Sequence, residues 1–199
     1  YNKKFGYYNK HNPFGRTGDF ITSPLVSNLF GEMIAIWCVS FWENLGKPKK
    51  IILVEMGPGD GKLCKDLLNA FKNFDHFYSC LEIKLIEKSS KLKIIQKNKI
   101  KSNKVQWIKK IEELKKGPVI FLCNEFFDAL PIKQIYIIRK TFFENFLCIT
   151  KNKKKIKFLK KNAPKNIIKS INKLKLSSKS GIVEYPIEAI KYLKLMSEK

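Results

Sequence analysis

An acidic residue followed by three evenly spaced glycines is the stretch of this chain that best suits chemistry. Glu55 directly follows an apolar run over residues 51–54, and Gly57, Gly59 and Gly61 come next. A short unbroken apolar run is typical of a strand buried on both faces of a parallel sheet. Leucines then recur at helical spacing. The stretch predicts strand, glycine turn and helix, the first crossover of a doubly wound α/β sheet whose ligands bind at the carboxyl ends of the strands.

The spacing of the glycines distinguishes between three kinds of glycine-rich binding loop. The dinucleotide pattern G-x-G-x-x-G fails because its third glycine would fall on Lys62, and the P-loop pattern fails at Met56 and Leu63. The remaining pattern, E-x-G-x-G-x-G, resembles motif I of class I S-adenosylmethionine (SAM) methyltransferases. SAM needs a bare backbone for close approach and a carboxylate, here Glu55, near its ammonium group. A purely structural glycine turn is the alternative.

A second acid stands where ribose is bound in related folds. Residues 81–86 read as a second strand, and Glu87 follows it. In dinucleotide folds an acid at this place accepts hydrogen bonds from ribose hydroxyls. Glu82 is the competing acid, but it lies within the strand and is expected to face solvent. We therefore expect Glu87 to bind the cofactor, with residues 74–79 forming a loop before its strand.

Three polar residues follow a fourth apolar run over residues 119–123. Asn124, Glu125 and Asp128 leave this predicted strand at its carboxyl end, beside the expected cofactor crevice, and are the candidate catalytic residues. Glu125 and Asp128 would share a face if a helical turn followed the strand. The alternative is that these side chains only cap the next turn.

A long helix is predicted before the first strand. Ser23 suits its N-cap and Pro24 its first position, while Gly46 and Pro48 end it. An apolar and aromatic stripe at helical spacing is expected to be core. The stripe contains Val26, Leu29, Phe30, Met33, Ile34, Trp37, Phe41 and Leu45.

The other predicted elements are helices over 62–73 and after Ser89, a strand at 105–107 and a short helix at 111–115. Beyond residue 131 the pattern predicts a hairpin over 132–150, a lysine-rich meander with a weak helix over 151–180, a strand at 182–184 and a helix over 186–196.

The composition fits a globular protein and argues against several partners. The 199 residues carry a formal net charge of +23, but this charge is lysine scattered through the chain, and the only arginines are Arg16 and Arg139. Because arginine is the usual reader of phosphates and base edges, we discount nucleic acid. Five cysteines without a C-x-x-C pair are expected to be reduced, buried thiols, and two histidines predict no metal site. The longest apolar stretch, residues 33–42, is too short to span a bilayer.

The chain resembles the MidA-like family of SAM-dependent methyltransferases from about the first residue to the last. Gly-Asp-Phe-Ile-Thr-Ser-Pro over 18–24 together with Asn-Glu-Phe-Phe-Asp-Ala-Leu-Pro over 124–131 is the specific pair of motifs. Further matches are Gly-Tyr-Tyr at 6–8, Phe-Gly-Glu at 30–32, the glycine motif and Leu-Ile-Glu at 85–87. The departures are Leu25 where the family usually has Glu, and Ile108 in place of the His of a Trp-His pair.

The resemblance implies a class I, Rossmann-like methyltransferase fold as one domain over 1–199. Its expected parts are an N-terminal helical extension over 1–48, a cofactor-binding core over 49–131, a lysine-rich, β-rich insert over 132–185 and a closing helix over 186–199. Because the family continues with a strand similar to Gly-Gly-x-Leu-Leu-Ile-Asp-Tyr-Gly, we expect further C-terminal strands to be missing from this sequence.

The family also implies an activity. It includes the mitochondrial protein arginine methyltransferase needed to assemble respiratory complex I, so the resemblance implies methylation of a protein arginine, with SAM as cofactor and complex I subunits as partners. By the same resemblance Gly18, Asp19 and Thr22 bind the cofactor. The expected location is the cytoplasm in a bacterium and the mitochondrial matrix in a eukaryote. The alternatives are an RNA or DNA methyltransferase and a non-catalytic assembly factor.

Overall fold

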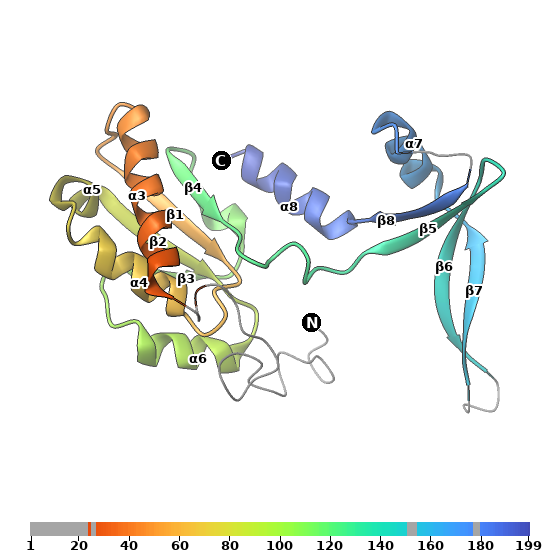
Figure 1. Ribbon diagram of the computed structural model, residues 1–199, viewed down its shortest axis with the longest axis horizontal. Helices are drawn as coiled ribbons and strands as arrows, with labels where there is room; N and C mark the ends of the chain where they lie inside the picture. The colour runs from red at the N-terminus through yellow and green to blue at the C-terminus, as the bar shows by residue number, and fades with distance from the viewer. Residues whose placement is uncertain (1–23, 25–26, 151–154, 177–179) are drawn as a thin grey trace. The chain divides into compact units, whose positions relative to one another are not determined.

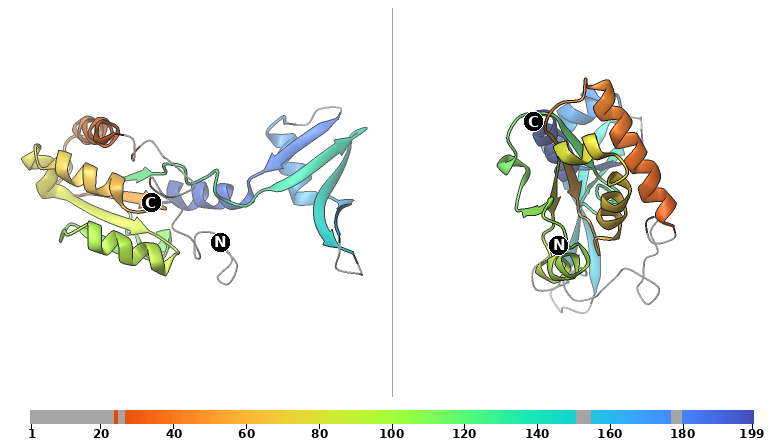
Figure 2. Two further views of the ribbon diagram at one scale, coloured as in Figure 1. Left: turned by 60° about the horizontal axis from the view of Figure 1, so that its bottom comes forward. Right: turned by 90° about the vertical axis from the view of Figure 1, so that its left-hand side faces the viewer.

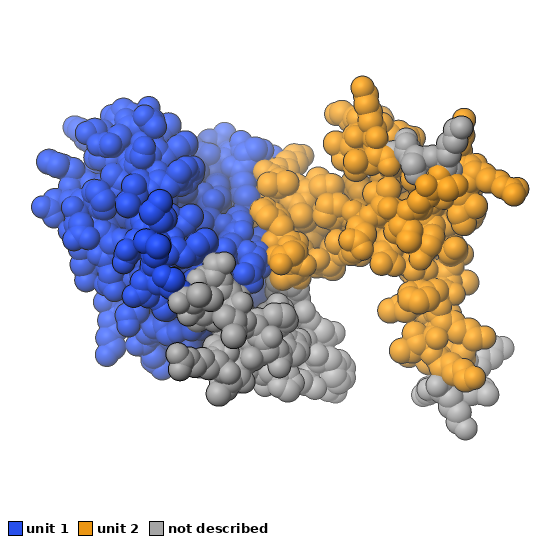
Figure 3. Space-filling model, in the orientation of Figure 1, with its two compact units in different colours: residues 1–126, 195–199 blue, residues 127–194 orange. Residues whose placement is uncertain are grey.

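The computed structural model describes residues 24, 27–150, 155–176 and 180–199, which form two compact units. The first contains the described residues up to Phe126 together with 195–199, and the second contains the described residues of 127–194 (Figure 3). Each unit has its own four-stranded sheet. The expectation of a single domain with the boundaries given above stays a prediction.

The first unit is an α/β layer structure around a parallel sheet, with strand order β3-β2-β1-β4 (Figure 1). Its elements in chain order are α3 (Asn28–Asn44), β1 (Ile51–Met56), α4 (Lys62–Phe71), α5 (Asp75–Cys80), β2 (Leu81–Ile86), α6 (Ser90–Lys99), β3 (Val105–Ile108), the 3₁₀ turn η1 (Ile111–Glu113) and β4 (Val119–Leu122). The predicted α/β fold and all four strands of this sheet are confirmed.

The strand register brings the predicted site residues to one edge of this sheet. Met56 of β1 is opposite Ile86 of β2, and Glu55 is opposite Leu122 of β4. The glycine turn, Glu87 and the residues after β4 therefore all leave the sheet at its carboxyl edge. The N–H of Gly57 donates to the carbonyl of Ile86 at 2.9 Å, so β1 and β2 remain paired up to the turn.

One face of the parallel sheet is covered by α3 and α4, which lie side by side (Figure 2). The predicted core stripe of α3 is confirmed for Phe30 and Ile34, which pack against the core. It is wrong for Leu29, Met33 and Trp37, which are each more than half exposed, and for Phe41 and Leu45, which are also exposed. Val26 lies outside the described residues. The buried side of the helix consists instead of Gly31, Ala35, Cys38, Val39 and Trp42. A Cβ at Gly31 would lie 2.7 Å from the Cβ of Asp66 in α4, so the close helix contact excludes large side chains there.

The start of α3 also differs from the prediction. Ser27 has an extended backbone, and its Oγ accepts a hydrogen bond from the N–H of Leu29 at 3.1 Å, so α3 begins at Asn28 rather than at Pro24. The predicted cap, Ser23, lies outside the described residues. The predicted loop over 74–79 is wrong as well, because α5 forms there. Burial of Phe77 against the rings of Phe71 and Trp42 stabilises this short helix.

The second unit contains an antiparallel sheet with strand order β7-β6-β5-β8. Its elements are β5 (Lys133–Ile138), β6 (Thr141–Ile149), β7 (Ile156–Asn162), α7 (Lys165–Lys173), β8 (Gly181–Tyr185) and most of α8 (Ile187–Ser197). Ile167 and Ile171 of α7 pack on Ile135 and Tyr185 of the sheet. The predicted hairpin, meander, weak helix, short strand and closing helix are all confirmed.

Candidate functional site

The glycine turn has the backbone that its sequence demands. Gly57, Gly59 and Gly61 have φ angles of +64°, +55° and +82°, which L-amino acids with side chains rarely adopt. A Cβ at Gly57 would lie 3.1 Å from the ring of Phe126, and one at Gly61 would lie 2.9 Å from Cδ1 of Ile100. The positive φ angles therefore favour glycine at these positions whatever the space around them, and a side chain at Gly57 or Gly61 would also have to displace a neighbouring side chain.

Glu55 is a buried acid with an unused oxygen. It is the fifth residue of β1, its side chain is 3% exposed, and its Oε2 has no hydrogen-bond partner among the residues that the structure describes. Burial, assisted by the negative charge of Asp60, raises the pKa of Glu55 to about 8. A buried oxygen without a partner costs free energy, and a cationic ligand group would satisfy it. As a hydrogen-bond acceptor, the free oxygen of Glu55 thus fits the ammonium group of an amino-acid moiety.

Glu87 directly follows β2 and is already hydrogen-bonded. Its Oε1 accepts from the N–H of Ser89 at 2.8 Å and its Oε2 from Nε2 of Gln96 at 3.3 Å. Burial raises the pKa of Glu87, although these hydrogen bonds and the nearby Lys93 act in the opposite direction. A carboxylate oxygen accepts more than one hydrogen bond, so both oxygens keep capacity for hydroxyl donors. Glu82, in contrast, is exposed and paired with Lys84 at 3.0 Å, as expected.

Gln96 is the residue of this site that the sequence pattern did not reveal. Its side chain is fully buried in α6, and Nε2 donates to the carbonyl of Gly59 at 2.7 Å. The indole Nε1 of Trp107 donates to Oε1 of Gln96 at 2.9 Å. The available signal was an amide at the centre of the apolar helical series Leu92, Gln96 and Ile100, where a third apolar residue would be expected.

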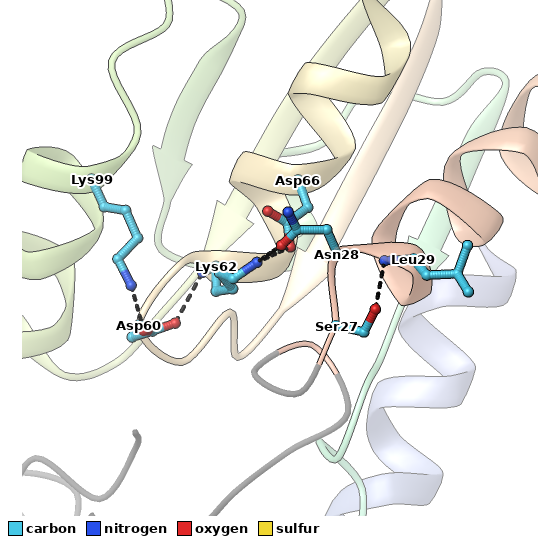
Figure 4. A network of polar contacts seen from close by, with 7 residues as sticks. All are labelled: Ser27, Asn28, Leu29, Asp60, Lys62, Asp66 and Lys99. Carbon is cyan, nitrogen blue, oxygen red and sulfur yellow. Dashed lines mark hydrogen bonds and ion pairs between the residues drawn. The ribbon is translucent and has the colours of Figure 1, made fainter. Parts of the chain in front are cut away.

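Charged contacts hold the turn on both sides (Figure 4). Oδ1 of Asp60 accepts from the N–H of Lys62 at 2.9 Å, and its Oδ2 forms an ion pair with Lys99 at the end of α6. Nζ of Lys62 contacts Oδ2 of Asp66, one helical turn further along α4, and Oδ1 of Asn28 at the start of α3. The turn is thus connected to three helices before any ligand binds.

The candidate catalytic residues follow β4 without forming a helix. Asn124 is partly buried, Glu125 is exposed, and the backbone of Glu125 has φ of +47°. The ring of Phe126 lies against Gly57, so the segment that follows β4 reaches the glycine turn at this residue. Asp128 belongs to the second unit and is exposed. The helical turn that would have put Glu125 and Asp128 on one face is absent: residues 124–130 form turns and bends, and the positive φ of Glu125 is incompatible with a right-handed helix.

Other predicted residues have different outcomes. Gly18, Asp19 and Thr22 lie outside the described residues. All five cysteines are free thiols, but only Cys38 and Cys64 are buried, so the expectation of burial is wrong for the other three. Those three lie at the end of a short helix, after an edge strand and in a two-stranded hairpin, where packing is thinner.

In the part of the chain that the structure describes, no group of three or more His, Cys, Asp and Glu side chains could hold a metal ion. None of the helices in this part of the chain has the length and apolarity that a membrane span requires.

The fold and this edge define the class of protein. A parallel α/β sheet with a glycine turn after its first strand and acids after the first and second strands is an architecture for nucleoside cofactors. The chain belongs to the family described as "Putative S-adenosyl-L-methionine-dependent methyltransferase", whose model matches residues 33–199.

Named relatives and a solved structure agree with this family. The chain is 37% identical over 158 residues to the mitochondrial protein arginine methyltransferase NDUFAF7 of Xenopus laevis, a match covering 67% of the chain and 36% of the relative. The human protein of the same name is 35% identical over 156 residues, covering 64% and 34%. The chain thus spans about a third of the length of these relatives.

A crystal structure of a Burkholderia thailandensis protein bound to S-adenosyl-homocysteine has the same fold. Its TM-score is 0.76 at 21% identity, covering 93% of this chain and 48% of that protein.

Proposed function

We propose that this chain binds SAM and contributes to SAM-dependent methylation of arginine in a protein substrate. The single observation that carries the proposal is the buried carboxyl group of Glu55, whose Oε2 has no partner within the described part of the chain, next to three glycines with positive φ. A purely structural turn would explain the glycines, but it would not explain why an acidic side chain with an unpaired oxygen is buried beside them.

The cofactor is held by residues of the carboxyl edge. Glu55 pairs with the ammonium group of SAM, the backbone of Gly57, Gly59 and Gly61 permits its close approach, and Glu87 accepts hydrogen bonds from the ribose hydroxyls. When bound, SAM supplies a methyl group on a positively charged sulfur and is therefore already reactive. The protein needs only to orient the two reactants and to stabilise the charges of the transition state. Gly18, Asp19 and Thr22 complete the cofactor site in this proposal.

The substrate is held by the residues that follow β4. A guanidinium remains protonated in proteins, so it must be bound as a cation. The carboxylate of Glu125 accepts its N–H groups and orients the nitrogen that receives the methyl group, with Asn124 or Asp128 in support. The positive φ of Glu125 fits this role, because strained backbone conformations concentrate at functional sites.

The relatives suggest the biological setting. The curated relatives named above are mitochondrial proteins described as protein arginine methyltransferases. We propose a protein substrate among the subunits of respiratory complex I, and a location in the mitochondrial matrix in a eukaryote or in the cytoplasm in a bacterium.

Two alternatives remain distinct. Adenine-modifying methyltransferases carry N/D-P-P-Y/F after the fourth strand, and Asn124-Glu-Phe-Phe127 keeps only its first and last positions. The added carboxylate suits a cation better than a neutral base. A non-catalytic assembly factor would bind SAM without transfer.

Isothermal titration with SAM and S-adenosyl-homocysteine, followed by transfer of radiolabelled methyl to protein and to nucleic acid, tests the proposal. Binding with labelled protein arginine supports it. Label in nucleic acid points to the first alternative, and binding without transfer to the second. Absence of binding overturns the cofactor site.

A further inference from the structure

The strongest unassigned feature is the contact between α6 and the glycine turn. Gln96, Lys99 and Ile100 lie on adjacent turns at the end of α6, and each meets the turn: Gln96 at the carbonyl of Gly59, Lys99 at the carboxylate of Asp60 and Ile100 against Gly61. Together these three contacts hold the glycine turn in one position relative to α6.

Every polar atom of the Gln96 side chain is used. Its two amide N–H donors match two acceptors, the carbonyl of Gly59 and Oε2 of Glu87. Its oxygen accepts from Trp107, whose indole nitrogen can only donate. Trp107 therefore decides the orientation of the amide and directs Nε2 toward the turn and Glu87. A flipped amide would put its oxygen against both acceptors and its NH₂ against a donor.

We propose that Gln96, oriented by Trp107, is a positioning residue that couples the glycine turn to Glu87, so that the amino-acid end and the ribose end of the cofactor are held at a fixed separation. This inference rests on the proposed function. Gln96 acts through Gly59 and Glu87 and need not contact the cofactor.

Gln96→Glu tests the coupling because it keeps the size of the side chain and replaces both donors with a carboxylate. Oε2 of Glu87 would then face a second carboxylate at about the distance it now has from Nε2, and two adjacent carboxylates tend to share one proton. The groups around them are Lys93 and the backbone N–H groups of Lys88 and Ser89, with Trp107 from β3. At low pH the shared proton restores one donor.

The experiment measures the dissociation constant for S-adenosyl-homocysteine from pH 6 to 8.5, each value divided by that of the parent chain. For Gln96→Glu we expect a ratio of about thirtyfold or more at pH 8.5 that falls toward about threefold at pH 6. For Gln96→Leu, which cannot be protonated, the ratio should stay at about tenfold or more throughout. Gln106→Glu is the matched control: Gln106 adjoins Trp107 in β3 but points to solvent and to Lys84. Its ratio should remain near one.

Trp107→Phe provides an independent variant if Gln96→Glu does not fold. It removes the orienting indole donor while keeping an aromatic ring, and about threefold to tenfold weaker binding is expected. A Gln96→Glu ratio that does not change with pH, or parent affinity in Trp107→Phe, overturns the coupling while the parent's binding keeps the proposed function. A parent chain that binds no cofactor overturns both.

Discussion

The parallel sheet and the antiparallel sheet each have four strands among the described residues, but their strand ends differ in how many side-chain contacts hold them. At the carboxyl edge of the parallel sheet, the turn after β1 is held by Gln96, Lys99 and Lys62. In the antiparallel sheet, β6 and β7 extend beyond β5 as a two-stranded hairpin, and every residue of β7 is exposed (Figure 1). Bracing of this kind keeps a turn in one geometry before a ligand binds, which is what a binding site requires.

The largest effect should come from a side chain inside the braced turn. Gly61→Val introduces a β-branched residue at φ of +82°, with its Cβ 2.9 Å from Ile100, and should lower the free energy of unfolding by about 3–5 kcal/mol. Chemical denaturation measures it. Gly46→Val is the matched control, since Gly46 has the same φ and a Cβ added there would meet no atom within 4 Å, and should lose only about 1–2 kcal/mol. Equal losses would show that backbone strain alone, and not bracing by α6, sets the need for glycine.

The next effect concerns the boundary between the two units. Glu125 belongs to the first unit and Asp128 to the second. Glu125→Gln keeps shape and removes charge, so it should reduce methyl transfer about a hundredfold while SAM affinity stays near that of the parent. Asp128→Asn should reduce transfer by about tenfold or less. Single-turnover transfer to protein measures both. An unchanged rate in Glu125→Gln removes that residue from the mechanism, and a larger loss in Asp128→Asn transfers the main role to it.

Elements that depend on local interactions can be predicted from the sequence, whereas elements that depend on contacts between distant residues cannot. Residues 81–86 and the Ser89 cap were found because apolar runs and caps are local signals. The helix α5 was missed because it depends on Phe77 reaching the distant ring of Trp42. The buried side of α3 was misassigned because the close approach of Asp66 to Gly31 cannot be read from spacing.

The site shows the same division. Glu55, Glu87 and the glycines were predicted from motifs, and the structure brings them to one edge. The contacts of Gln96 join residues on four different elements and loops, and Gly59 lies 37 residues from it, so the spacing of residues along the chain does not predict these contacts. Their roles in binding stay predictions.

A smaller effect should appear in the pH dependence of binding. Because the pKa of Glu55 is about 8, its carboxyl is mostly protonated at pH 7, and pairing with an ammonium group lowers that pKa. Cofactor binding should therefore release about one proton at pH 7, and the dissociation constant should fall about tenfold per pH unit between pH 6 and 7.5. Calorimetry in buffers of different ionisation enthalpy measures the release.

The carboxyl group of Glu55 also determines how the stability of the cofactor-free chain changes with pH. Its folded-state pKa lies above its ordinary value of 4.5, so the folded chain binds more protons and loses stability as the pH rises from about 4.5 to 8. Glu55→Gln should remove this loss and most of the proton release. Glu82→Gln, at an exposed acid whose pKa is lowered by Lys84, should change neither. Proton release that persists in Glu55→Gln would assign it to Glu87 instead.

The smallest effect is expected where the antiparallel sheet is thinnest. Leu147 of β6 and Phe158 of β7 are direct cross-strand partners, yet they are 68% and 72% exposed. Replacing each with Thr keeps the preference for strand structure and removes only a solvent-facing contact, so the free energy of unfolding should change by about 0.5 kcal/mol or less per site. SAM affinity should be unchanged. Ile135→Ala in β5 is the contrasting variant, because Ile135 is fully buried under α7 and its truncation should cost about 2–4 kcal/mol. A loss of stability at Leu147 or Phe158 as large as at Ile135 would mean that the side chains of the β6–β7 hairpin are packed in solution. The hairpin would then not differ in packing from the braced edge of the parallel sheet.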